Sequence, residues 1–152
     1  MADVKTVVDA ANRLAAKDEE SLVLLIGMME QEIKKNPALK EDANLQPKYD
    51  QTTMGFMDPL KEAGGRILRR WNKELHGLVC GTQARDRKER QEILGALNLG
   101  ETAVIGAVAA ALLAMGVPAP IAAALAPLIV RKFIWPAKDE LCKSWAEGIA
   151  RA

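Results

Sequence analysis

The stretch that decides the fold is TAVIGAVAAALLAMGVPAPIAAALAPLIV, residues 102–130, which carries no charged side chain. As a single helix these roughly 29 residues would reach about 43 Å at 1.5 Å per residue, more than the roughly 30 Å of bilayer hydrocarbon. The run from Gly116 to Pro120 contains two prolines near the middle, and it is expected to stop the helix there. Each half is then about 21 Å long, too short for a membrane span and typical of a buried core helix.

Small side chains fill both halves of this stretch, with alanine the commonest residue and Gly106 in the first half. Small residues let helix backbones approach closely, so the halves are predicted to pack as an antiparallel hairpin. The predicted fold class is all-α: a compact bundle of about seven helices around a central apolar helical hairpin at 102–130. At 152 residues the chain suits a single helical domain, residues 1–152, that buries roughly two thirds of its unfolded surface.

Flanking segments show the apolar spacing of amphipathic helices. These segments are residues 3–16, 18–35, 58–80, 84–100 and 137–152. Asp18 is expected to cap the second segment, whose acidic first turn and basic last turn complement the helix dipole. Asp58-Pro59 is expected to open the third segment, and Pro136 to open the fifth.

Glycines and prolines interrupt this regular pattern. Gly64-Gly65 costs about 1 kcal/mol per glycine relative to alanine, so a kink or a tight crossing with another helix is expected there. Residues 36–55 contain two prolines and no sustained period, which predicts a long loop with a helical turn. Pro127 removes one backbone donor inside the second half of the apolar stretch, so it is expected to bend that helix.

Composition narrows the classes of function. The 49% hydrophobic and 27% charged residues are typical of a globular protein rather than a disordered one. The net charge is +1, and residues 58–100 carry 9 basic and 6 acidic side chains that interleave, so nucleic acid is not an expected partner. The cysteines lack redox or metal spacing and the first residues lack a secretory pattern. We therefore expect reduced thiols in a cytoplasmic protein that can relocate to a membrane. The alternative is one disulfide between Cys80 and Cys142 in an oxidising compartment, although a chain of this size does not require it.

The catalytic inventory is small. His76 is the only histidine, and it lies four residues before Cys80, where an imidazole can lower the pKa of a thiol. No orienting acid or oxyanion hole accompanies the pair, so we predict no catalytic residues and no enzyme activity. One histidine and two distant cysteines cannot form a closed tetrahedral site, and no phosphate-binding glycine motif is present. We predict no metal, no cofactor and no small-molecule substrate.

Basic and aromatic residues gather in RILRRWNKELHG, residues 66–77. Arginine and tryptophan are the side chains that most often anchor protein interfaces. The preferred hypothesis is a non-enzymatic protein-protein interaction or assembly module that binds a protein partner or itself. The competing interpretation places the tryptophan in the core and the basic residues on a solvated face. The predicted partner-binding residues are Arg66, Arg69, Arg70, Trp71 and Lys73.

The alternative function uses the apolar stretch itself. Some soluble helical proteins insert a buried hairpin into bilayers, and this analogy of architecture predicts a pore-forming or permeabilising protein. Phe133 and Trp135 lie beside Arg131 and Lys132, in a basic-aromatic cluster suited to a membrane boundary or to closing the core. The competing interpretation is a permanently buried core. The membrane-insertion candidates are Val104, Val108, Leu112, Ile121, Leu125, Phe133 and Trp135.

Overall fold

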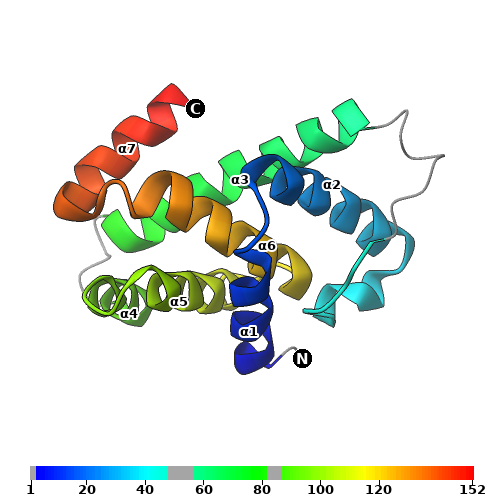
Figure 1. Ribbon diagram of the computed structural model, residues 1–152, viewed down its shortest axis with the longest axis horizontal. Coiled ribbons are helices and arrows are strands. Elements are labelled where there is room, and N and C mark those ends of the chain that lie inside the picture. Colours follow the sequence, from blue (N-terminus) through cyan, green and yellow to red (C-terminus); the bar gives the residue numbers. More distant parts are fainter. Residues whose placement is uncertain (1–2, 48–56, 82–86) are drawn as a thin grey trace.

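The computed structural model describes residues 3–47, 57–81 and 87–152, and within them the chain is helical with no strand (Figure 1). Its helices pack into a bundle, as the sequence predicts. The α-helices are α1 (Val4–Leu14), α2 (Glu19–Lys35), α3 (Met57–Cys80), α4 (Lys88–Leu97), α5 (Glu101–Ala114), α6 (Ala119–Ile129) and α7 (Leu141–Arg151).

The apolar stretch breaks where its prolines predict. α5 ends at Ala114 and α6 begins at Ala119, with Gly116 between them at a φ of 95° that favours glycine. In Figure 1, α6 runs back above α5 and lies at the centre of the fold, in contact with α1, α2 and α5. Every residue from 119 to 130 is buried. Because α6 packs on all sides, its sequence has no need of a polar face.

α6 continues into a π-helical turn, Val130–Ile134, in which the Trp135 N–H donates to the Val130 carbonyl at 2.8 Å. Pro127 lies inside α6, one turn before this widening. The turn presents Arg131, whose guanidinium donates to the Lys17 carbonyl at 2.9 Å and to the Ala15 carbonyl. These carbonyls follow the end of α1, so Arg131 supplies donors and positive charge at a helix C-terminus.

The predicted cap of α2 is confirmed. The Asp18 carboxylate accepts a hydrogen bond from the Ser21 backbone N–H at 2.7 Å, and the helix runs from Glu19 to Lys35. Hydrogen bonds from the Ser21 side chain and backbone lower the pKa of Asp18 below its usual 3.8, since they stabilise the ionised carboxylate. Leu22 and Ile26 then turn into the core.

α2 and α3 cross at two glycines. A methyl group on Gly64 would overlap the Val23 carbonyl, and one on Gly27 would overlap the Leu60 carbonyl. Only hydrogen at both positions lets the two backbones approach this closely. The tight crossing expected at Gly64-Gly65 is therefore confirmed for Gly64, which faces α2.

Three helix starts differ from the sequence prediction. The helix expected over 84–100 begins at Lys88, after the extended residue Arg87, and residues 84–86 lie outside the described ones. α3 begins at Met57, which places Asp58 and Pro59 in its first turn rather than at a cap. α7 begins at Leu141 instead of just after Pro136, because the chain first makes tighter turns that include the 3-10 helix Lys138–Glu140. In the segment predicted as a loop, the 3-10 helix Pro37–Glu41 is the expected helical turn, while residues 48–55 lie outside the described residues.

Within the described ranges, no individual helix has both the length and the apolar composition to cross a bilayer. Residues 119–134 and 138–151 reach that length and composition only together, and their axes differ by 77°.

Candidate functional site

The predicted partner-binding residues lie along α3, and the structure separates the cations from the tryptophan. Arg66, Arg69, Arg70 and Lys73 are exposed, whereas Trp71 is half-buried against the core. The Arg70 guanidinium lies over the Trp71 ring, 4.6 Å from its centre. At this distance the ring attracts the positive charge through a cation–π interaction. Trp71 therefore packs partly against the core, and its ring also contacts the Arg70 guanidinium.

The cations of this surface, which we call the α3 basic face, are free of ion pairs among the described residues. Glu62 and Glu74 stand four residues from Arg66 and Arg70, the spacing at which helical ion pairs form, but the structure has no such bridge there. Among the described residues, no carboxylate therefore neutralises the positive charge of the α3 basic face.

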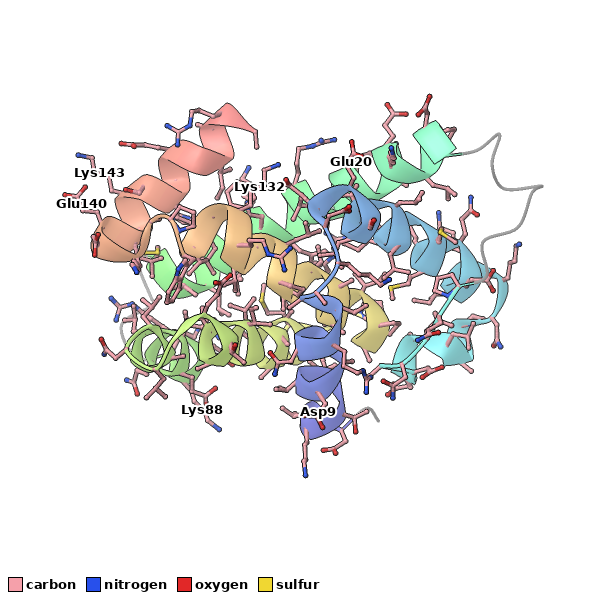
Figure 2. All side chains as sticks on the ribbon, in the orientation of Figure 1. Asp9, Glu20, Lys88, Lys132, Glu140 and Lys143 are labelled. Carbon is pink, nitrogen blue, oxygen red and sulfur yellow. A yellow bond between two sulfur atoms is a disulfide. The ribbon has the colours of Figure 1, made fainter. Side chains whose placement is uncertain are left out.

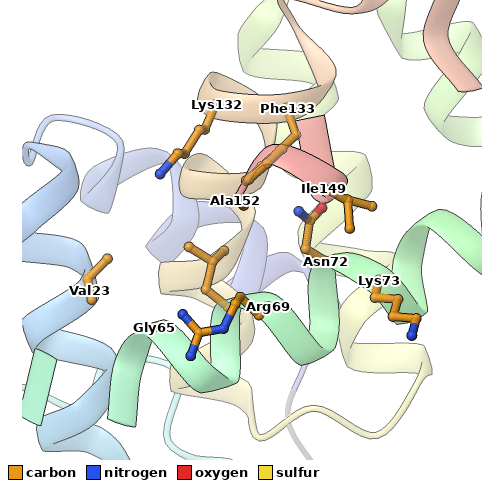
Figure 3. Close-up of a pocket in the computed structure, with 10 residues that line it drawn as sticks. Val23, Gly65, Arg69, Asn72, Lys73, Lys132, Phe133, Ile149 and Ala152 are labelled. Atoms are coloured by element: carbon orange, nitrogen blue, oxygen red, sulfur yellow. The ribbon is translucent and has the colours of Figure 1, made fainter. Parts of the chain in front are cut away.

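One side of the α3 basic face borders a cavity of about 410 Å³, which we call the α3 cavity (Figure 3). It lies between α3, the π-helical turn and α7, and Val23 of α2 also lines it. Its apolar wall comes from Leu68, Phe133 and Ile149. The π-helical turn places Phe133 here, so a residue predicted for membrane insertion and the residues predicted for partner binding meet at one cavity. Gly65, the second glycine of the pair, also lines it.

Cations stand at the edge of the α3 cavity. Arg69, Lys73 and Lys132 are among its lining residues, and Figure 3 shows Lys73 turned away from the other two. Lys132 makes an ion pair with Glu19 at 2.9 Å and lies 5.8 Å from the centre of the Phe133 ring. Both partners of that ion pair are about half exposed, so the pair contributes little to stability and can exchange with another anion.

Asn72 is a site residue that the sequence analysis missed. It is only 2% exposed, and its Oδ1 accepts a hydrogen bond from the Trp145 indole nitrogen at 2.7 Å. That bond orients the amide and leaves its nitrogen donors for the cavity that Asn72 lines. The signal was present in the sequence, because Asn72 occupies the helical spacing of the buried residues Leu68, Leu75 and Val79.

The seam between α3 and α7 corrects the expectation of reduced thiols. Cys80 and Cys142 form a disulfide, with their Cα atoms 5.6 Å apart and a separation of 62 positions in sequence (Figure 2). Pairing at this range depends on where helices meet, so sequence spacing could not show it. His76 Nε2 lies 3.1 Å from the Cys142 carbonyl oxygen, and its ring contacts Trp145 edge-on at 5.1 Å.

This arrangement leaves the His76-Cys80 pair without a thiol, so it cannot act as a nucleophilic dyad. Among the residues that the structure describes, no three histidine, cysteine, aspartate or glutamate side chains gather where a metal ion could be held.

The remaining membrane-insertion candidates form the core. Val104, Val108, Leu112, Ile121 and Leu125 are buried, as is Phe133, and Trp135 is half-buried with Lys138 4.3 Å from the centre of its ring. Charged side chains lie around the outside of the bundle, as Figure 2 shows for Asp9, Lys88 and Lys143.

Comparisons of the chain with protein-family models, with curated proteins and with solved structures found no match.

Proposed function

We propose that this protein is a non-enzymatic interaction module whose α3 basic face binds an acidic segment of a protein partner. The observation that carries the proposal is the exposed, unbridged state of Arg66, Arg69, Arg70 and Lys73 within the described chain. Complementary charge speeds association and selects the partner more than it raises affinity. The same chemistry allows self-association, because the chain also carries acidic helix starts such as Glu19-Glu20.

The surroundings of the α3 basic face support a role in binding. Trp71 and the Arg70 guanidinium over its ring give the face an aromatic element, and arginine and tryptophan are both enriched among the residues that dominate interface energies. The disulfide at the C-terminal end of α3 argues for an oxidising environment, while a cytoplasmic location remains a sequence prediction.

The test uses a synthetic peptide of glutamates around a central leucine as the probe, with binding followed by calorimetry at low and high salt. Arg66→Glu/Arg70→Glu should weaken binding of the peptide by about tenfold or more. High salt should weaken binding of the peptide by the wild-type protein. Lys88→Glu/Lys143→Glu makes the same change in net charge, but on α4 and α7. This variant should bind the peptide with nearly the affinity of the wild type. Equal loss in both variants, or no binding, would contradict the proposal.

Self-association is distinguished by sedimentation of the protein alone. Oligomers that dissociate in Arg66→Glu/Arg70→Glu would place the contact on the α3 basic face. Oligomers that persist in the folded variant would place it elsewhere.

A second candidate function is membrane insertion of the apolar stretch. It is favoured by α6, which has no polar side chain and whose end is held to the first two helices by Arg131 and by the exposed Lys132–Glu19 pair. Dye release from anionic liposomes at neutral and mildly acidic pH tests it. Release that accompanies burial of a probe attached to Gly106→Cys is expected, and its absence at both pH values would contradict this candidate.

A further inference from the structure

We infer that the α3 cavity is a binding site for a free single-chain anionic amphiphile, a carboxylate of about ten carbons. This ligand goes beyond the proposed protein interaction, and it changes the expectation from sequence that no small molecule is involved. It is bound rather than transformed.

The size of the α3 cavity sets the length of the ligand. Its volume of about 410 Å³ lies in the range of small-molecule sites, about 300–1,000 Å³. Taking the share of one water molecule, about 30 Å³, as the volume of a methylene group, the cavity accommodates about a dozen non-hydrogen atoms. A ten-carbon carboxylate has that size.

The walls of the cavity set the chemistry of the tail. Leu68 and Phe133 are buried core residues that present apolar surface to the cavity, and Ile149 adds to it from α7. Covering this surface with an alkyl chain removes it from water, which favours binding by about 25 cal/mol per Å² of apolar area. A fully polar ligand would gain nothing from these walls.

The edge of the cavity sets the chemistry of the head group. In Figure 3 the side chains of Lys132 and Arg69 both extend toward the left, Lys132 above and Arg69 below, and Asn72 lies to their right, below Phe133. A carboxylate placed there can accept from the guanidinium and the ammonium, and such charge-assisted bonds are the strong ones. Lys132 would exchange its exposed Glu19 partner for the ligand.

Asn72 adds a polar side chain to this end of the cavity. Its side chain is buried, and the Trp145 indole satisfies its oxygen. The amide nitrogen points toward the cavity in Figure 3, where it can donate a hydrogen bond to a ligand. A carboxylate oxygen is an acceptor of the required kind.

The test titrates the protein with decanoate, with acetate as the head group alone and decanol as the tail alone. Binding is followed by NMR, because the side-chain amide of Asn72 gives its own signal. We expect saturable, one-to-one binding of decanoate about tenfold or more tighter than either control, with shifts at the Asn72 amide. Absence of saturable decanoate binding would overturn the inference.

Gly65 offers a variant that fills the cavity without changing charge. A methyl group at Gly65 meets only Arg69 Nη1, at 3.5 Å, so Gly65→Leu can be accommodated on the helix and would project into the cavity. Gly77→Leu makes the same exchange on α3 where nothing lies within 4 Å. Decanoate binding should fall about tenfold or more in Gly65→Leu and stay unchanged in Gly77→Leu; equal binding in both would overturn the inference.

Charge variants separate this site from the α3 basic face. Lys132→Gln should weaken the binding of decanoate and leave the binding of the glutamate peptide unchanged. Arg66→Glu/Arg70→Glu should weaken the binding of the peptide and leave that of decanoate unchanged. Lys143→Gln, an exposed lysine on α7, serves as the matched control. Phosphatidylglycerol vesicles provide a last arm, and binding to vesicles without saturable decanoate binding would identify a membrane surface and overturn the inference.

Discussion

α6 and the seam between α3 and α7 are both interior, but they are stabilised in different ways. α6 is apolar, buried on every side, and contacts several helices without a polar side chain of its own. The α3–α7 seam instead depends on individual bonds: the Cys80–Cys142 disulfide, the Asn72–Trp145 hydrogen bond and the contact of His76 with the Cys142 carbonyl.

This difference predicts different responses to damage. Hydrophobic packing is spread over many contacts and involves the whole bundle, so a defect in α6 lowers global stability. α7 lies at one side of the bundle in Figure 1 and contacts mainly α3 and the turns that precede it. Damage to the seam should therefore loosen α7 first, together with the cavity wall that α7 supplies.

The largest effect is expected from Leu125→Ala in the middle of α6. Leu125 is fully buried, so the substitution leaves a cavity and should cost about 4 kcal/mol of unfolding free energy. Urea unfolding followed by circular dichroism measures it. Leu99→Ala, at a position 80% exposed, is the control and should change stability by less than about 0.5 kcal/mol; similar costs at both positions would refute the role assigned to α6.

Removing the disulfide should have the next largest effect. Cys80→Ser/Cys142→Ser frees a loop of 62 residues in the unfolded chain and should cost about 3 kcal/mol. Hydrogen exchange should accelerate in α7 more than in α6, since the seam loses its covalent tie. Wild-type protein treated with a dithiol reductant should show the same pattern of hydrogen exchange as the variant. If exchange accelerated equally in α6 and α7, the contrast between the two regions would be wrong.

Gly64 and Gly65 provide a sharper pair, because adjacent residues should respond in opposite directions. Gly64→Ala forces α2 and α3 apart and should cost about 2 kcal/mol. Gly65→Ala has room for its methyl group and should gain up to about 1 kcal/mol from higher helix propensity. Thermal unfolding of both variants is the measurement, and the same sign for both would contradict the close crossing.

The smallest effect concerns the cap of α2, remote from the seam. Hydrogen bonds from Ser21 lower the pKa of Asp18 in the folded protein, so its ionised form stabilises the fold above the unfolded pKa. That contribution is lost as the pH falls through the folded pKa. Asp18→Asn caps without titrating, so the stability of the wild type relative to this variant should decrease in acid. Melting temperatures across an acidic pH series test this, and a constant difference would argue against the cap.

Much of the fold could be predicted because its signals are local. Gly116 and Pro118 break the apolar stretch through backbone sterics. Asp18 caps α2 through a hydrogen bond to a residue three positions along. The pair Gly64-Gly65 predicted a kink or a tight crossing, because glycine inside a helix requires compensation by close packing, and Gly64 makes the crossing.

The candidate site was predictable only in part. Arg69 and Lys73 were identified from their clustering on one helix, but the cavity also needs Lys132 and Phe133 from the π-helical turn and Ile149 from α7. From the sequence, Lys132 and Phe133 were instead assigned to a basic-aromatic cluster at a membrane boundary or at the edge of the core. Asn72 could have been noticed as a polar residue in a buried register, although nothing local names Trp145 as its partner.

By itself, the sequence determined the helical class, the break in the apolar stretch and the α2 cap, because each depends on backbone conformation and apolar spacing within a few residues. Only the tertiary structure decided the disulfide, the Asn72–Trp145 bond, the Lys132–Glu19 pair and the cavity that Asn72 and Lys132 help to line. These contacts join residues more than 60 positions apart. Their formation depends on the angles at which helices pack, and those angles arise from the summed shape of many side chains.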